Sequence, residues 1–127
     1  MKEGVNFNVR KCKKIKQTHM MVNEKYRKAV DKFVKIALEK YGDKIADVIL
    51  FGSVVRGEAK ENSDIDVLIV TRKEDFRLRR SLVGLAFDIL LETGENISVK
   101  VLSKDDFEKH KNFSFLKNVI LDGVRLA

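Results

Sequence analysis

The sequence of 127 residues has one cysteine, Cys12, and neither proline nor tryptophan. A single cysteine excludes an internal disulfide framework and a cysteine-rich zinc module, and it is typical of the reducing cytoplasm, where we expect the protein to reside. No apolar run approaches the ~20 residues of a membrane-spanning helix. Lysines interrupt the first 21 residues, where a secretory signal would be apolar. We therefore expect neither a membrane protein nor a secreted one.

Hydrophobic residues make up 44% of the sequence, enough to build a core in one domain of this length. A chain that is mainly disordered is excluded for the same reason, because such chains lack apolar residues to offset their conformational entropy. We find no internal repeat and no low-complexity tract. The sequence therefore predicts a single domain, to which we assign residues 23–127.

The net charge of +7 is located at one end of the chain. Residues 1–28 contain nine lysines and arginines and two acids, whereas the remaining residues contain 17 of each sign. We interpret residues 1–22 as a basic N-terminal arm. A solvated, mobile arm is the simpler interpretation, and contact of residues 1–28 with nucleic acid rests on charge alone.

Hydrophobic periodicity predicts alternating helices and short apolar strands. Helices are predicted at 23–41, 74–92 and 113–121, strands at 45–51, 65–70 and 97–102, and a capping box at 103–106. Phe87, Phe113 and Phe115 are assigned to inward-facing positions. The predicted fold class is α/β (α+β), with a short mixed sheet of three or four strands and helices packed on one side.

Two short motifs carry the candidate chemistry. Gly52 and Ser53 follow a predicted buried strand, where a glycine lets the backbone approach a ligand and a helix start can hold phosphate. Asp64 and Asp66 lie ten residues later, at the start of the next strand. Because side chains alternate across a strand, both carboxylates project from one face and can bind magnesium ions. Together the motifs are typical of metal-assisted attack on a nucleotide phosphate.

A purely structural account of these motifs is also available. Gly-Ser after a strand is common turn chemistry, and Asp64 can serve as a cap before the strand. Asp66 resists that account, because an acid within an apolar strand costs stability unless it is paired or metal-bound. The combination of both motifs, each on its expected element, favours a functional origin.

Gly52-Ser53 followed after ten residues by Asp64-Ile65-Asp66 resembles the signature of the DNA polymerase β-like nucleotidyltransferase superfamily. The segment from Gly52 to Gly57 is similar to its minimal nucleotidyltransferase branch, and the resemblance covers about residues 45–102. It implies that Gly52 and Ser53 hold a nucleoside triphosphate, with ATP as the expected donor, and that Asp64 and Asp66 coordinate Mg²⁺. It also implies transfer of a nucleoside monophosphate to a hydroxyl, for which a HEPN-type partner protein is one acceptor, as in antitoxins.

The pattern of this family is incomplete in the third strand. Active members carry a third carboxylate there, whereas the corresponding face of residues 97–102 presents Ser98 and Lys100; Glu95 is the nearest acid. Arg56 suits two roles equally, contact with phosphates and anchoring of its loop. Two interpretations follow: an active nucleotidyltransferase, or a degenerate module that binds a nucleotide or a partner without catalysis.

Overall fold

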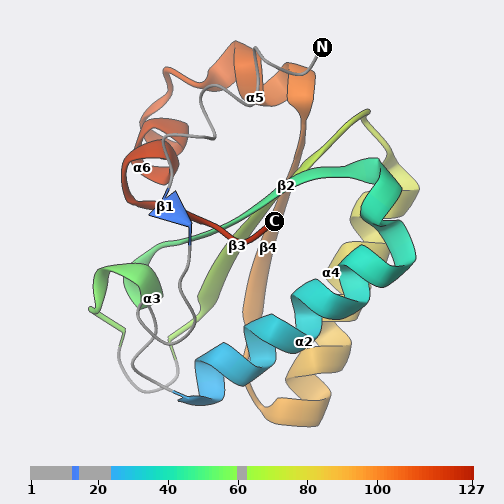
Figure 1. Ribbon diagram of the computed structural model, residues 1–127, viewed down its shortest axis with the longest axis vertical. Helices are drawn as coiled ribbons and strands as arrows, with labels where there is room; N and C mark the ends of the chain where they lie inside the picture. Colours follow the sequence, from blue (N-terminus) through green and yellow to red (C-terminus); the bar gives the residue numbers. More distant parts are fainter. Residues whose placement is uncertain (1–12, 15–23, 60–62) are drawn as a thin grey trace.

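The computed structural model describes residues 13–14, 24–59 and 63–127 (Figure 1). The predicted basic arm therefore lies outside the described residues except for Lys13–Lys14. No helix of the described residues is long and apolar enough to cross a membrane.

A mixed sheet forms the centre of the molecule. Its main strands are β2 (Ile45–Phe51), β3 (Ile65–Thr71) and β4 (Ile97–Ser103), with β2 and β3 antiparallel and β3 and β4 parallel. Two strands of two residues, β5 (Val124–Arg125) and β1 (Lys13–Lys14), complete the order β1-β5-β2-β3-β4 among the described residues. The mixed sheet confirms the predicted fold class. The two shortest strands were not predicted because two residues carry no recognisable period.

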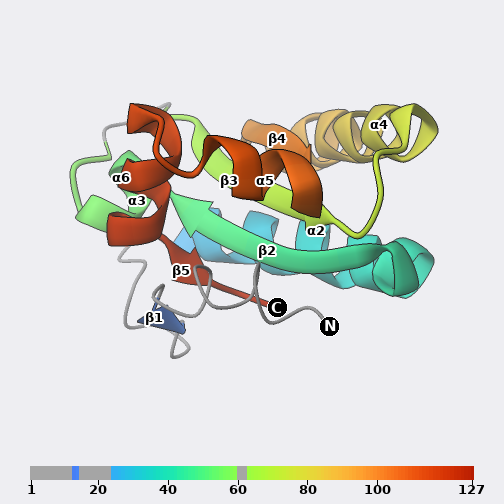
Figure 2. The same ribbon diagram turned by 90° about the horizontal axis from the view of Figure 1, so that it is seen from above.

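Helices α2 (Glu24–Tyr41) and α4 (Phe76–Thr93) pack against each other and cover one face of the sheet (Figures 1 and 2). A 3₁₀ turn, η2 (Gly42–Lys44), links α2 to β2. The side chain of Asp75 begins α4 by accepting a hydrogen bond from the Leu78 N–H at 3.0 Å. The larger hydrophobic cluster fills this layer and contains Val30, Phe33, Leu50, Val67, Ile69, Leu82 and Ile89.

The opposite face of the sheet is covered by α5 (Lys104–His110) and α6 (Ser114–Asp122). A smaller cluster lies there, formed by Ile49, Leu68, Val70, Phe107, Leu116 and Val119. The prediction that helices pack on one side only was therefore wrong. Strands β2 and β3 are continuous apolar runs, and such runs require cover on both faces because their side chains alternate.

Three phenylalanines that were predicted to face inward are exposed. Phe87 is 56% exposed on α4, Phe113 is 62% exposed before α6, and Phe115 is 42% exposed on α6. Phe87 lies opposite the buried residues of α4, whereas Phe115 lies beside the buried side of α6 and contacts Phe51 while it stays partly exposed. The capping box, in contrast, is confirmed, since the Ser103 hydroxyl accepts a hydrogen bond from the Asp106 N–H at 3.1 Å.

Candidate functional site

The Gly52–Ser53 turn connects β2 to a short helix, α3 (Ser53–Arg56). The Gly52 carbonyl accepts hydrogen bonds from the N–H groups of Val55 and Arg56, both at 3.1 Å. Gly52 has φ 86°, and a Cβ atom built on it would lie 2.3 Å from Oδ2 of Asp66. Only glycine fits both this conformation and this contact. The turn therefore lies directly against one of the two predicted metal ligands.

Asp64 and Asp66 lie on the same face at the start of β3. Asp66 pairs in register with Phe51 of β2 and with Ser98 of β4, and its side chain shares the face of Leu68. Asp64 is exposed and Asp66 is half-buried. The structure thus brings both carboxylates together with Gly52 and Ser53, on the side of the sheet that α6 covers.

The charges around Asp66 act in opposite directions on its carboxyl group. Burial raises the pKa of Asp66 above its ordinary value, and the ammonium of Lys100 lowers it; the carboxylate of Asp64 raises this pKa and Arg56 lowers it. Two carboxylates that share one half-buried site favour a cation between them. This donor set fits a divalent ion such as Mg²⁺, which binds through one or two carboxylates and keeps positions for water and phosphate oxygens.

Asn96 is a site residue that sequence reasoning missed. Its side-chain N–H donates to Oδ1 of Asp64 at 2.9 Å, and its carbonyl accepts a hydrogen bond from the Ile65 N–H at 2.9 Å. Both contacts arise because β3 and β4 are parallel, with Ile65 beside Ile97. Asp64 and Asn96, which precede these two strands, therefore lie side by side. Asn96 could have been predicted only from the parallel register of β3 and β4.

Ser98 and Lys100 lie on the face of β4 where a third carboxylate was expected. Val99 and Val101 pack against the larger cluster, so Ser98 and Lys100 face the side of the aspartates. The Lys100 ammonium donates to the Ser98 hydroxyl at 3.0 Å. The described residues contain no group of three or more His, Cys, Asp or Glu side chains suited to hold a metal, so Glu95 does not complete a triad with the aspartates.

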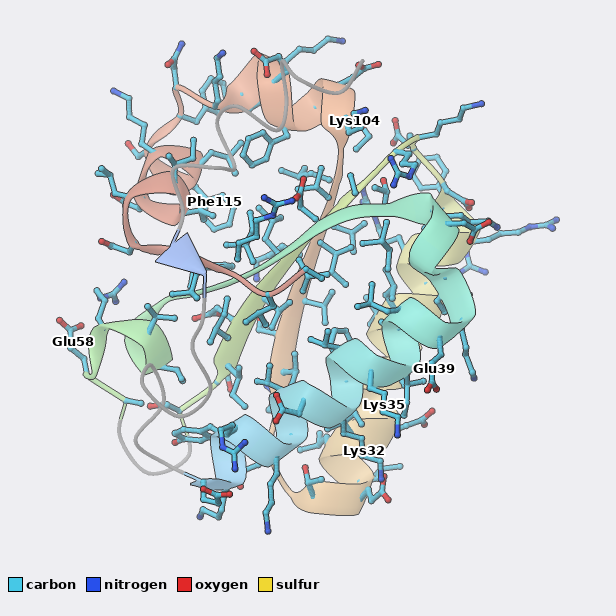
Figure 3. All side chains as sticks on the ribbon, in the orientation of Figure 1. Lys32, Lys35, Glu39, Glu58, Lys104 and Phe115 are labelled. Carbon is cyan, nitrogen blue, oxygen red and sulfur yellow. The ribbon has the colours of Figure 1, made fainter. Side chains whose placement is uncertain are left out.

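Arg56 ties the turn to the end of α6. Its guanidinium forms ion pairs with Glu58 at 3.0 Å and with Asp122 at 4.0 Å, and all three side chains are exposed. Figure 3 shows Glu58 at the outer corner beside α3. These ion pairs favour the anchoring role. Arg56 also lowers the pKa of Asp66, so its charge acts at the candidate site, as contact with phosphates requires.

An apolar cavity of about 470 Å³ lies beside Lys100, at the open edge of β4. Its lining includes Val83, Val101, Phe113, Phe115 and Leu116, together with the cations Arg79 and Lys100. Phe115 points toward the sheet (Figure 3) and its ring packs edge-on against Phe51 at 5.4 Å, next to the position of Asp66 in the register. Arg79 donates to the Val101 carbonyl at 3.1 Å. The candidate site thus borders a cavity suited to an apolar group.

Comparisons with known proteins agree on one family. Residues 30–126 match the model of the nucleotidyltransferase domain. A Methanocaldococcus jannaschii protein, named for a proposed protein adenylyltransferase activity, is 41% identical over 96 residues, covering 76% of this chain and 92% of its own. A second protein of that organism, named likewise, is 33% identical over 100 residues, covering 76% of this chain and 67% of its own.

A solved structure also resembles the chain. It is a crystal structure of a mutant of the toxin-antitoxin MntA-HpeT, with 21% identity and a TM-score of 0.47, covering 77% of this chain and 71% of that chain. At this level of similarity the likeness carries no argument about function.

Proposed function

Because the chain belongs to the nucleotidyltransferase domain family, we propose that it transfers adenosine monophosphate from Mg²⁺-bound ATP to a hydroxyl group and releases pyrophosphate. The observation that carries this proposal is the placement of Asp66 directly against the Gly52 turn, with Asp64 close enough to act on the charge of Asp66. Adenylyl as the transferred group is supported by the names of the two relatives. A cytoplasmic location belongs to the same proposal and is supported by the single cysteine, Cys12, because the reducing cytoplasm keeps thiols free.

In this proposal some residues of the site bind phosphate and others bind the metal ion. Gly52 and Ser53 hold the triphosphate: Gly52 lets the Asp66 carboxylate lie against the turn, and the Ser53 hydroxyl and N–H donate hydrogen bonds to phosphate oxygens. Asp64 and Asp66 hold Mg²⁺, which would screen phosphate charge and polarise the attacked phosphorus when bound. Asn96 fixes the orientation of Asp64. Arg56 keeps the turn in place and supplies positive charge near the phosphates.

The acceptor is proposed to be a hydroxyl of a partner protein. The names of the relatives, protein adenylyltransferases, support a protein acceptor. The cavity beside Lys100 supports an acceptor carried on an apolar segment, because its walls are apolar. The HEPN-type partner stays a proposal that rests on the resemblance of residues 52–66.

One observation favours a second candidate function, a module that binds nucleotide or a partner protein without transfer. Lys100 supplies an ammonium where the family has a carboxylate, and this charge opposes a metal ion near Asp66. A general base for the incoming hydroxyl is therefore missing from the described residues at that position.

The two candidates are separated by measuring binding and transfer on the same protein. Labelled ATP with Mg²⁺ is added to the protein alone and to the protein with the product of the neighbouring gene, and transferred label is followed. Thermal unfolding with and without Mg²⁺-ATP reports binding, because a ligand that binds only the folded state raises the melting temperature. Binding with transfer supports the enzyme, and binding without transfer supports the module.

The matched controls are pairs of aspartate substitutions. Asp64→Asn with Asp66→Asn is expected to abolish most of the thermal shift. Asp43→Asn with Asp105→Asn, at exposed positions beyond the opposite ends of β2 and β4, is expected to preserve it. A thermal shift that survives in the first pair would place the nucleotide elsewhere and overturn both candidates.

A further inference from the structure

The outer side of α4 carries an apolar stripe that the monomer does not bury. Phe76, Val83, Phe87 and Leu91 are 66%, 50%, 56% and 70% exposed, and Val83 also lines the cavity beside Lys100. At 3.6 residues per turn these positions fall within an arc of about 80°, opposite the buried positions of the same helix. We call these four residues the outer stripe of α4. Its apolar side chains add nothing to the core, and exposed apolar side chains gathered on one side of a helix mark an interaction site.

The outer stripe is centred on a glycine. The midpoint between Phe76 and Leu91 falls between Val83 and Gly84. Gly84 is exposed, and a Cβ atom on it would meet no heavy atom within 4 Å. The monomer therefore has room for alanine, which is the better helix former at a helix interior. A glycine at this point lets a second helix approach the backbone closely where the two cross.

Charges of opposite sign lie in the two halves of α4, with Arg80 inside the arc of the outer stripe and Arg77 and Asp88 beside it. Arg77 and Arg80 lie in the first half of α4, and Asp88 lies in the second half. If a second α4 runs antiparallel with its midpoint at the same place, Arg80 of one helix lies opposite Phe87 of the other and beside its Asp88. Charge complementarity of this kind orients partners and selects among them.

We infer that the outer stripe of α4 is the interface of a twofold dimer, in which α4 packs antiparallel against α4 of a second copy and crosses it at Val83 and Gly84. A twofold interface uses the same patch on both subunits and must be complementary to itself. About the midpoint of α4, Phe76 of one copy lies opposite Leu91 of the other, and Arg80 lies beside Asp88 at two equivalent contacts. These opposite charges favour a second copy of this chain as the partner.

The first test measures oligomeric state by analytical ultracentrifugation over about a hundredfold range of concentration. The wild-type chain is expected to shift from monomer to dimer as concentration rises. Val83→Arg places two like charges at the crossing point and is expected to weaken the dimer at least about tenfold. Leu121→Arg, at another exposed leucine on α6, is the matched control and is expected to leave the dimer unchanged.

A charge exchange tests the antiparallel geometry. Arg80→Glu alone and Asp88→Arg alone each place like charges across the interface, so each variant is expected to dimerise less than wild type. An equal mixture of the two variants is expected to recover association as a heterodimer, because opposite charges then face each other at both contacts. A parallel arrangement does not predict this recovery.

Gly84→Ala separates folding from association. Alanine is expected to raise the melting temperature of the dilute monomer and to weaken the dimer, because its methyl group enters the crossing point. A chain that stays monomeric at every concentration, or a dimer that survives Val83→Arg, would overturn the inference. A monomer that binds another protein through Val83 would assign the outer stripe to that protein and likewise overturn the dimer.

Discussion

Gly52 is the residue on which the geometry of the site depends most directly. Its φ of 86° disfavours any side chain, and a methyl group would lie 2.3 Å from Oδ2 of Asp66. Gly52→Ala is therefore expected to lower the free energy of unfolding by about 2 kcal/mol or more and to displace the Asp66 carboxylate. Urea denaturation measures the first effect. The control Gly42→Ala, where a Cβ meets nothing within 4 Å, is expected to be near neutral; equal losses in both would contradict the argument.

Asp66 is expected to titrate above the ordinary range of an aspartate, because burial disfavours its charged form. In metal-free protein, Lys100→Gln should raise this pKa further by removing the charge that opposes burial. A raised pKa means that the folded state binds the proton more tightly, so stability falls as pH rises through that pKa. Each unit of elevation corresponds to about 1.4 kcal/mol. Carboxyl NMR titration of wild type and Lys100→Gln measures both values, and an unchanged pKa in the variant would contradict this account.

Lys100 is expected to limit affinity for divalent metal. Lys100→Asp replaces a repelling charge by an attracting one beside Asp66, so Mg²⁺ binding should tighten by about tenfold or more. Calorimetric titration with Mg²⁺ measures this. Lys109→Asp, at an exposed lysine of α5, is the matched control and should change binding little. Faster adenylyl transfer by Lys100→Asp would show that the lysine slows the reaction. An unchanged affinity for Mg²⁺ would contradict an effect of Lys100 on the metal.

The sequence predicted which candidate residues come together but not all of their contacts. Strand parity predicted that Asp64 and Asp66 share a face, and the alternation of β4 predicted that Lys100 faces them. Asn96 escaped prediction because an asparagine before a strand is ordinary turn chemistry. Its contact with Asp64 depends on the parallel register of β3 and β4, which no local pattern encodes.

At the scale of elements, β2 shows what periodicity can and cannot predict. Residues 45–51 were predicted as a strand with the bounds that the structure shows. The same apolar run also implied cover on both faces, which the prediction of one-sided helices overlooked. The pairing of β2 with β5 could not be predicted from hydrophobic periodicity, because it involves only two residues of each strand.

The pairing of β2 with β5 includes a buried ion pair. Asp47 is fully buried and contacts the Arg125 guanidinium at 3.0 Å. Burial raises the pKa of Asp47, and Arg125 opposes this effect. Arg125→Met leaves the carboxylate without its partner, so the free energy of unfolding at neutral pH should fall by about 3 kcal/mol.

The loss in Arg125→Met should shrink in acid. Without Arg125 the pKa of Asp47 rises further, so the folded variant takes up its proton at higher pH and regains stability as pH falls through that pKa. Thermal unfolding of both proteins across pH 4 to 7 measures the difference (about 1.4 kcal/mol per unit of pKa). Asp47→Asn combined with Arg125→Met should remove most of the pH dependence. A loss that is constant with pH would contradict an electrostatic origin.

At the scale of the whole molecule, the family was the most secure prediction. The spacing between Gly52-Ser53 and Asp64-Ile65-Asp66 combines turn geometry with strand parity, and few other folds need both at once. The match of residues 30–126 to the nucleotidyltransferase domain confirms it. The outer stripe of α4 could not be predicted from the sequence. Helical spacing alone does not tell whether Phe87 lies on the buried or the exposed side of the helix.

The two faces of the sheet carry hydrophobic clusters of different size, and this difference affects how easily the helices on each face unfold locally. Among the described residues, 17 buried residues hold α2 and α4 to one face, whereas six hold α5 and α6 to the other. Amide hydrogen exchange is therefore expected to be faster in α5 and α6 than in α2 and α4, since subglobal opening costs least where few apolar contacts are lost. Equal protection in both layers would contradict this. Asp66 lies on the less protected side, and α6 contacts the site through Phe51 and Arg56, so a bound nucleotide should slow exchange in α6 first. Protection of α6 then becomes a reporter of occupancy.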